Sequence, residues 1–214
     1  MERKDMLHRM YDIKGPLVAK KFAARGFEAA YCPTVAEALQ KAVSYIPETD
    51  VVSWGGSVSI EQIGLKDYVK KHNRVLDRDT AKTPAERVEI MRRALLCDTF
   101  LMGGNAAVQD GQLVNIDGNG NRVAALCYGP KQVIAILGMN KVVPTVEAGI
   151  ERAHNVASPI NIGRFPDVVT PCAKTGMCAH CTSPDSVCAQ VVCTRVCKPL
   201  GRIKVIFVGE NLGY

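Results

Sequence analysis

The sequence predicts an α/β fold with a mainly parallel sheet, flanking helices and one inserted antiparallel hairpin. Short apolar stretches alternate with longer stretches of helical spacing, which is the pattern of βαβ units. The capping boxes Thr34–Glu37 and Thr83–Glu86 are each expected to start a helix after a strand. Asp110-Gly111, between two apolar stretches, predicts a tight hairpin turn because both residues tolerate positive φ.

Six apolar stretches are expected as strands, and the segments between several of them as helices. The strands are expected at 28–31, 50–54, 74–77, 99–102, 131–137 and 203–208. Helices are expected in 6–22 (one or two, interrupted at Gly15-Pro16), 34–43, 60–69, 83–96 and 145–155. The stretch 158–182 is rich in Pro, Gly and Cys and is expected to be irregular.

Composition narrows the class of protein. A chain of 214 residues fits one domain with a small appendage. The net charge of +6 comes partly from short basic clusters spread along the chain, so no nucleic-acid-binding face is expected. No apolar run approaches the roughly 20 residues of a membrane span, and residues 1–11 lack the features of a secretory leader. Nine cysteines favour a reducing compartment, and a cytoplasmic location is therefore expected.

Four cysteines near the C-terminal end have a spacing that predicts a metal or iron–sulfur site. The spacing is Cys172-x5-Cys178-x2-Cys181-x6-Cys188, and its central C-x-x-C pair lets two thiolates converge on one metal ion. Because two flanking cysteines could complete a four-thiolate shell, a [4Fe–4S] cluster is expected, with zinc as the alternative. A redox dithiol at Cys178 and Cys181 is a third interpretation.

The other five cysteines are interpreted as packing residues, since a free cysteine behaves as a small hydrophobe. Cys32, Cys97 and Cys127 stand singly in apolar surroundings and are expected to be buried. Cys193 and Cys197 are expected one turn apart on a helix, with some chance of serving as substitute ligands.

Glycine pairs follow two of the expected strands. In open α/β sheets, ligands bind beyond the carboxyl ends of the strands, where glycine allows close approach of the backbone. Gly55-Gly56-Ser57 also precedes a helix, whose free backbone donors could hold a phosphate or a carboxylate. With Gly104 and Asn105, these residues are candidate ligand-binding positions. Tight turns that happen to need glycine are the alternative.

The segment 115–122 concentrates amides, an acid and an arginine around two glycines. Asp117 could act as an acid or base there, Arg122 as an anion clamp, and Asn121 as a further binding residue. The alternative is an elaborate turn whose side chains cap their own backbone. Lys141, after the strand at 131–137, is expected either to face the same cleft or to be solvated.

The chain resembles the LUD-domain family, named from lactate-utilisation proteins, and the likeness covers nearly its whole length. The residues that carry it are Gly55-Gly56-Ser57, Ile63-Gly64, Gly104-Asn105-Ala106, most of 110–124, Gly129-Pro130-Lys131, 138–143, 171–188 and Gly201-Arg202-Ile203. The resemblance implies a fold like that of ribose-5-phosphate isomerase, glucosamine-6-phosphate deaminase and the CoA transferases. It also implies a cleft formed by 55–57, 103–105, 117–122 and Lys141. Gln62 stands where a glutamate is expected, which puts a catalytic role for that carboxylate in doubt.

This resemblance divides the chain into a stand-alone LUD-type domain (1–165 and 199–214) and a cysteine-rich segment (166–198). Family members in lactate oxidation work beside iron–sulfur subunits, so a redox partner subunit is one expectation and a homo-oligomer another. The leading hypothesis is an iron–sulfur enzyme, or enzyme subunit, that acts on a small anionic metabolite with a carboxylate or phosphate group. The alternatives are a non-enzymatic binding or regulatory module with a structural metal, and an enzyme like the sugar-phosphate isomerases or CoA transferases.

Overall fold

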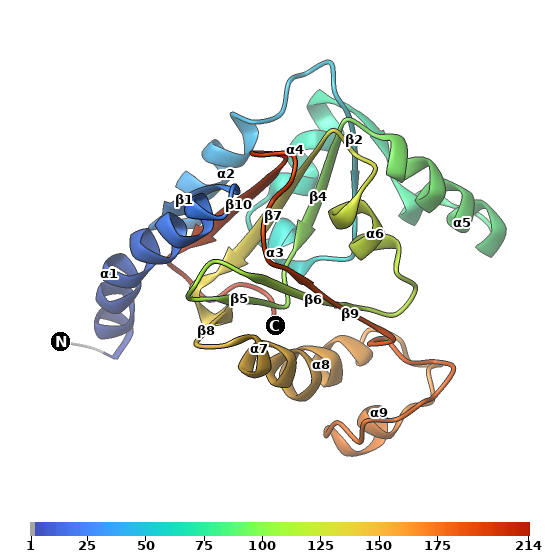
Figure 1. The fold of residues 1–214 in the computed structure, drawn as a ribbon. Helices are drawn as coiled ribbons and strands as arrows, with labels where there is room; N and C mark the ends of the chain where they lie inside the picture. Colours follow the sequence, from blue (N-terminus) through green and yellow to red (C-terminus); the bar gives the residue numbers. More distant parts are fainter. Residues whose placement is uncertain (1–2) are drawn as a thin grey trace.

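The computed structural model describes residues 3–214, and its centre is a six-stranded parallel sheet with the order β1-β10-β7-β4-β2-β3 (Figure 1). The strands are β1 (Glu28–Cys32), β2 (Val51–Trp54), β3 (Arg74–Leu76), β4 (Thr99–Gly103), β7 (Gln132–Gly138) and β10 (Ile203–Val208). All five neighbouring pairs are parallel. The predicted α/β class and the mainly parallel sheet are therefore confirmed.

Helices cover both faces of this sheet, as a buried parallel sheet requires. The first six helices in chain order are α1 (Arg3–Ala24), α2 (Val35–Val43), α3 (Val58–Gln62), α4 (Leu65–His72), α5 (Pro84–Arg93) and α6 (Asn121–Cys127). Helices α1 and α6 share one core with Val133 and Leu137 of β7. Helices α2, α3 and α4 share the opposite core with Ile134 and Ile136. Alternate residues of β7 thus point to opposite faces.

The helix starts follow the predicted capping chemistry. The Thr34 hydroxyl accepts a hydrogen bond from the backbone N–H of Glu37 at 3.3 Å, and Thr83 does the same for Glu86 at 3.1 Å. Each threonine satisfies a backbone donor that the first turn leaves free. The N-terminal stretch forms a single helix that continues through Pro16.

A second, four-stranded sheet with the order β8-β5-β6-β9 begins directly where β4 ends. Its strands are β5 (Ala106–Val108), β6 (Leu113–Asp117), β8 (Val142–Val143) and β9 (Gln190–Thr194). β5 and β6 form the predicted antiparallel hairpin, and β9 pairs antiparallel with β6. The hairpin therefore belongs to a sheet of its own and is not inserted into the main one.

The prediction of a helix that carries Cys193 and Cys197 is wrong. Cys193 lies in β9 opposite Val114, because the β-branched residues of 190–194 pair with the free edge of β6. Cys197 is fully buried in the main core. The end of the cysteine-rich segment (166–198) is thus part of the second sheet. The prediction that Cys127 is buried is also wrong, since its place at the end of α6 leaves it exposed, whereas Cys32 and Cys97 are buried.

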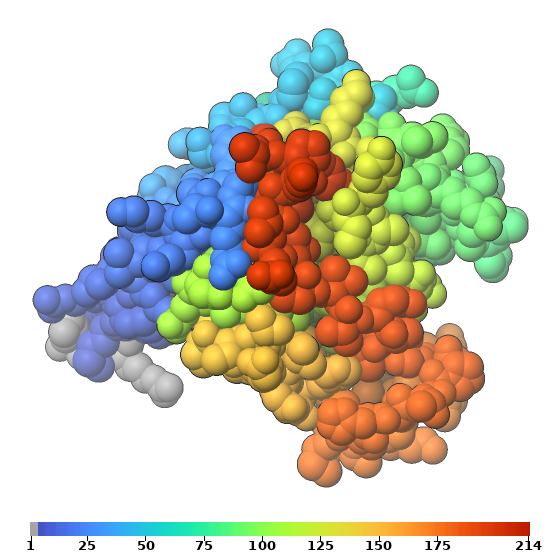
Figure 2. Space-filling model, viewed as in Figure 1, coloured from blue at the N-terminus to red at the C-terminus, as the bar shows by residue number. Residues whose placement is uncertain are grey.

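The chain between β8 and β9 is more regular than expected. It contains α7 (Val146–Arg152), a π-helical turn (Ala153–Ala157), α8 (Ser158–Ile162) and α9 (Pro171–Thr175). The stretch 158–182 therefore holds two short helices, of which α9 starts at the capping residue Thr170. In the space-filling view, the region around α9 forms a lobe at one end of the molecule (Figure 2). Among the described residues, no helix is long and apolar enough to cross a membrane.

Candidate functional site

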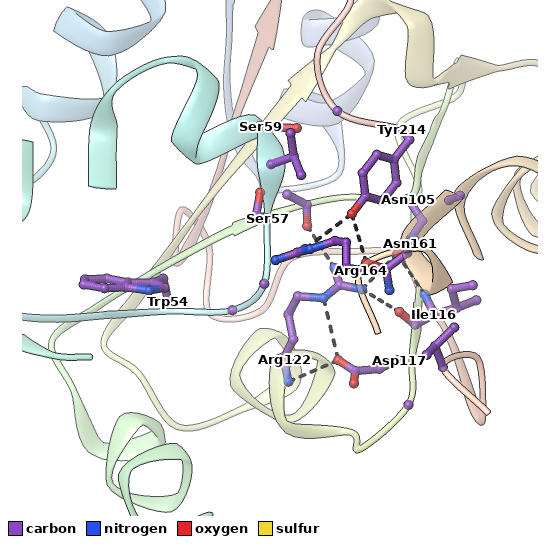
Figure 3. A pocket seen from close by; sticks show the side chains of 18 of the residues that line it. Trp54, Ser57, Ser59, Asn105, Ile116, Asp117, Arg122, Asn161, Arg164 and Tyr214 are labelled. Atoms are coloured by element: carbon purple, nitrogen blue, oxygen red, sulfur yellow. Dashed lines mark hydrogen bonds and ion pairs between the residues drawn. The ribbon is translucent and has the colours of Figure 1, made fainter. Parts of the chain in front are cut away.

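The main pocket lies at the carboxyl ends of β2, β4 and β7 and has a volume of about 230 Å³. From β2 the chain moves outward to β3, whereas β4 returns on the other side of β2. The carboxyl ends of β2 and β4 therefore flank a topological switch point, which is where open α/β sheets bind ligands. The second sheet, α8 and Tyr214 complete the walls (Figure 3).

The structure brings all nine predicted cleft residues to this pocket. The lining includes Gly55, Gly56, Ser57, Gly104, Asn105, Asp117, Asn121, Arg122 and Lys141. They come from the loops after β2 and β4, from β6 with the turn that follows it, and from the 3-10 turn after β7. This result shows only where the nine residues lie. What each side chain can do chemically depends on the groups that it contacts.

Two of the glycines permit close packing beneath the pocket. A Cβ on Gly55 would stand 2.8 Å from Cδ of Arg122, and one on Gly103 would stand 2.8 Å from the Ser57 hydroxyl. Both distances are shorter than side-chain contacts allow. These glycines therefore let Arg122 and Ser57 lie against the strand ends.

Arg122 is held by the protein itself. Its guanidinium is buried and donates to the carbonyls of Gly103 and Ile116 and to the amide oxygens of Asn105 and Asn115. Burial lowers the pKa of Arg122, although the nearby Asp117 carboxylate favours its charged form. With its donors directed at protein oxygens, Arg122 ties the hairpin to the end of β4. Arg122 thus supports the pocket floor, and its role as an anion clamp stays a prediction.

Asp117 caps the turn into α6. One carboxylate oxygen accepts from the N–H of Gly120 at 3.0 Å, and the other accepts from the N–H groups of Arg122 and Val123 at 3.2 and 3.3 Å. Arg122 Nε lies 3.6 Å from the same carboxylate (Figure 3). These contacts favour the alternative interpretation of segment 115–122, in which side chains cap their own backbone.

Lys141 lies at the base of the pocket and is 3% exposed. Its ammonium donates to the Ser59 hydroxyl at 3.1 Å and to the carbonyl of Gly104 at 3.2 Å. Burial, with the charges of Arg152 and Arg122 as smaller contributions, lowers the pKa of Lys141 to about 7. It is not a solvated lysine, and near neutral pH it exists in both protonation states.

Several pocket residues carried no signal in the sequence. Arg78 comes from the 3-10 turn Arg78–Thr80, and Arg164 from the loop after α8. Arg164 donates to the Tyr214 hydroxyl at 3.3 Å, which in turn donates to Asn161 at 2.9 Å (Figure 3). No spacing rule links these positions, because long-range folding alone brings them to the strand ends.

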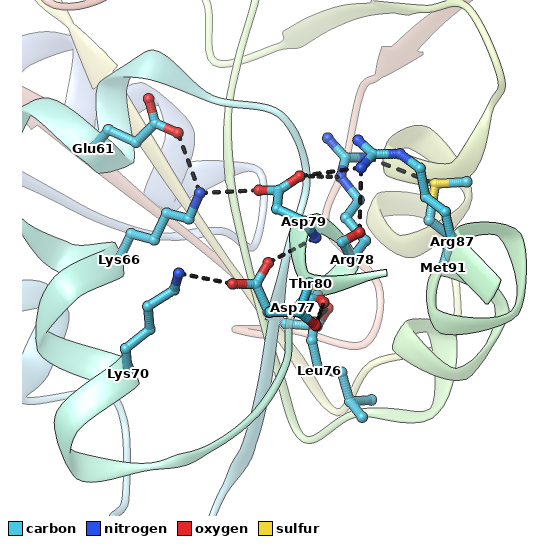
Figure 4. Close-up of polar contacts among 11 residues, drawn as sticks. Glu61, Lys66, Lys70, Leu76, Asp77, Arg78, Asp79, Thr80, Arg87 and Met91 are labelled. Atoms are coloured by element: carbon cyan, nitrogen blue, oxygen red, sulfur yellow. Dashed lines mark hydrogen bonds and ion pairs between the residues drawn. The ribbon is translucent and has the colours of Figure 1, made fainter. Parts of the chain in front are cut away.

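The rim near β3 is an ion-pair network (Figure 4). Lys66 lies 3.0 Å from Asp79 and 3.5 Å from Glu61, and Arg87 lies 3.3 Å from Asp79. Burial by itself would raise the pKa of Asp79, but the hydrogen bond from Lys66 and the charges of Lys66, Arg78 and Arg87 lower it. Asp79 therefore stays ionised and neutralises part of the positive charge on this side.

The cysteine-rich segment runs beside the pocket. Val187 is one of the lining residues, and Gly118 packs against Ser186 and Val187. Cys172, Cys178, Cys181 and Cys188 are all partly exposed free thiols. The Cys178 sulfur lies 3.9 Å from Nδ1 of His154. Within the part of the chain that the structure describes, no three His, Cys, Asp or Glu side chains form a group that could hold a metal ion.

Fold and site together define a class: an α/β protein with a basic pocket at the carboxyl ends of a parallel sheet. The chain belongs to the LUD domain family, whose model matches residues 16–208. This confirms the resemblance found in the sequence.

Comparison with solved structures supports the fold. A DUF162-family protein from Deinococcus radiodurans has a TM-score of 0.53 at 14% identity, over 92% of this chain and 97% of that one. A likeness to eIF2B delta from Chaetomium thermophilum has a TM-score of only 0.30 at 20% identity, over 49% of this chain and 47% of that one, and carries no argument. The curated protein sequences contain no match to the chain.

Proposed function

We propose that the chain is an enzyme that binds a small anionic metabolite in the main pocket and uses Lys141 to transfer a proton. The observation that carries this proposal is the buried ammonium of Lys141, which lies at the base of a pocket with basic walls. A group with a pKa near the working pH is the most efficient general acid or base.

The charges around the pocket support an anionic ligand. Among the described residues, six basic side chains line the pocket against three acidic ones. The basic residues are Lys66, Arg78, Arg87, Arg122, Lys141 and Arg164, and the acidic ones are Glu61, Asp79 and Asp117. An excess of one sign in a cleft with low-dielectric walls concentrates ligands of the opposite sign.

The surroundings of Lys141 support a role in proton transfer. Its contacts with Ser59 and the Gly104 carbonyl fix the amine in one place, so it needs no reorganisation when a proton moves. The neutral amine can accept a proton from a bound metabolite, and the ammonium can return one. A purely structural lysine would more commonly be paired with a carboxylate.

Trp54 offers a direct test, because it is the one tryptophan of the chain and it lines the pocket. Small carboxylates and phosphates should change its fluorescence, and the Lys141→Met variant should respond more weakly. Lys131→Met, which removes an exposed lysine outside the pocket, is the matched control. NMR in D₂O then tests proton transfer through deuterium incorporation into the bound compounds. Binding without Lys141-dependent exchange for any ligand would favour a non-enzymatic binding module.

We further propose that Cys172, Cys178, Cys181 and Cys188 bind a [4Fe–4S] cluster, with zinc as the alternative. All four are free, partly exposed thiols in a segment with one five-residue helix before β9, so the backbone is not locked against their convergence. The chemistry of the four thiols fits either metal, although they do not converge in the present arrangement. Such a cluster would let the chain exchange electrons with a redox partner subunit. Free thiols that are ready to bind it would be kept reduced in the cytoplasm.

Metal analysis after anaerobic purification tests this second proposal. Iron and sulfide in stoichiometric amounts would support the cluster, whereas one zinc ion per chain would support the zinc site instead. Cys181→Ser should lower the metal content, whereas Cys193→Ser, at an exposed cysteine of β9, should not. If Cys178→Ser and Cys181→Ser both keep all the metal, the ligand assignment is wrong.

A further inference from the structure

Two arginines from distant segments meet over the first glycine loop of the pocket. A Cβ built on Gly56 would stand 3.0 Å from Nη2 of Arg78 and 3.8 Å from Nη1 of Arg164. Both guanidinium groups therefore lie on the same side of Gly56, and both residues line the pocket. The absence of a side chain at this position keeps the space between the loop and the two guanidinium groups open.

The Arg78 guanidinium has few protein partners, although its side chain is only 17% exposed. Among the described residues, Nε has no hydrogen-bond partner, and Nη1 donates only to the sulfur of Met91 at 3.7 Å. The Asp79 carboxylate lies 3.9 Å from Nε, and it also serves Lys66 and Arg87. A mostly buried guanidinium with unused donors is costly unless a ligand satisfies them.

Arg164 is similarly available. The one hydrogen bond of its side chain within the described structure is the 3.3 Å contact with the Tyr214 hydroxyl, which is a neutral partner. Burial lowers the pKa of Arg78, and the charges of Arg87 and Arg164 act in the same direction. Two guanidinium groups that repel each other favour a counter-ion between them.

We infer that Arg78 and Arg164, over the backbone at Gly56, form a subsite for the phosphate group of a phosphate monoester. A single bidentate arginine suffices for a carboxylate, which has one charge and two oxygens. A phosphate monoester near neutral pH has almost two charges and three acceptor oxygens, and matches two arginine forks. The inference rests on the proposed function and names its substrate class.

This subsite also orients the substrate. Ser57 and Ser59 stand one and three residues beyond Gly56, and Lys141 donates to Ser59. A phosphate held at Gly56 would leave the remainder of a small metabolite facing the Lys141 end of the pocket. The phosphate group thus anchors the substrate at Gly56, and the reacting part of the substrate lies near the Lys141 amine.

The test compares inorganic phosphate and glycerol 3-phosphate with acetate and succinate, by calorimetry and Trp54 fluorescence at low ionic strength. Both phosphates should bind at least about tenfold more tightly than either carboxylate. Arg164→Gln and Arg78→Lys should each weaken phosphate binding by about 10- to 100-fold, the range for one charge-assisted contact. Arg92→Gln removes the same charge from an exposed position of α5 and should leave binding unchanged.

The outcomes separate this inference from the proposed function. Equal or tighter binding of acetate or succinate, lost in Lys141→Met but kept in the arginine variants, would overturn the phosphate subsite and leave the proposed function standing. Undiminished phosphate binding in both arginine variants would also overturn it. If no anion binds at all, both proposals fail. Arg164 is exposed, so Arg164→Gln remains a valid test if Arg78→Lys does not fold.

Discussion

The ammonium of Lys141 lies 3.1 Å from the hydroxyl of Ser59, although the two residues are 82 positions apart and both are buried. Ser59 belongs to α3, which starts after β2, and Lys141 to the 3-10 turn after β7. Their contact therefore spans the carboxyl end of the sheet. It gives the lysine a neutral hydrogen-bond acceptor, and among the described residues no carboxylate forms an ion pair with the ammonium.

Ser59→Ala should lower the pKa of Lys141 further. The hydroxyl accepts a hydrogen bond from the charged form, and such bonds contribute about 1.5–3 kcal/mol. Its loss leaves the Gly104 carbonyl as the remaining hydrogen-bond acceptor of the amine, and should shift the pKa downward by about one unit. The measurement is the pH dependence of Lys141 labelling by an amine reagent, followed by mass spectrometry.

Ser57→Ala is the matched control for that experiment. The Ser57 hydroxyl caps α3 by accepting from the N–H of Ile60, and in the described structure the Lys141 ammonium donates to Ser59 and Gly104 instead. Its replacement should cost stability, typically about 1 kcal/mol for a lost cap, and leave the labelling profile in place. Equal profiles for wild type and Ser59→Ala would show that the hydroxyl does not stabilise the ammonium.

Lys141 should make the stability of the fold depend on pH. Its pKa is about 7 in the folded chain and 10.5 when unperturbed, so the unfolded chain binds more protons between these values. The free energy of unfolding should therefore rise with pH from 7 toward 10.5, and the full penalty of the buried ammonium is present below pH 7. Between pH 6 and 9.5 the wild type should gain roughly 3 kcal/mol relative to Lys141→Met.

Urea denaturation of both proteins at several pH values measures this difference. The comparison with Lys141→Met cancels the titration of the other groups, because both chains share them. A constant difference across this pH range would mean that the folded pKa of Lys141 is close to its ordinary value.

Local sequence rules predicted the framework of the fold. The capping residues Thr34 and Thr83 and the turn at Asp110 act within a few residues, so their chemistry is readable from the chain alone. The prediction failed at Cys193, where the residues 190–194 follow the edge of β6 instead of the local helical spacing. Pairing with a distant strand outweighed local preference there.

The candidate site was predictable only in part, for the same reason. Glycine pairs at strand ends have a positional meaning, and they led to Gly55 and Gly104. Arg78 and Arg164 stand in segments without a motif and reach Gly56 through tertiary folding. The roles of Asp117 and Arg122 also depended on geometry, since the sequence shows an acid and a base but not that they satisfy each other and the backbone.

Arg122→Gln should destabilise the fold more than it weakens ligand binding. It removes a buried guanidinium that serves Gly103, Asn105 and Asn115, and it leaves the Asp117 carboxylate without its cation. Breaking a buried pair in this way costs about 3–5 kcal/mol. Thermal or urea unfolding measures the loss, and Arg92→Gln at an exposed position should change stability by less than about 0.5 kcal/mol. A fully stable Arg122→Gln that binds anions poorly would instead support the anion-clamp prediction.

The adjacent glycines Gly55 and Gly56 should respond in opposite ways to alanine. A methyl group on Gly55 would meet the buried stem of Arg122 at 2.8–2.9 Å, and the stem cannot move without breaking its hydrogen bonds. Gly55→Ala should therefore cost about 1–3 kcal/mol of stability, as overpacking does.

A methyl group on Gly56 would meet only the ends of the Arg78 and Arg164 side chains, which can shift. Gly56→Ala should keep its stability and lose phosphate affinity, because the methyl group occupies the space between the loop and the two guanidinium groups. Unfolding curves and phosphate titrations on the two variants measure both quantities, and equal effects of the two substitutions would contradict this division of roles.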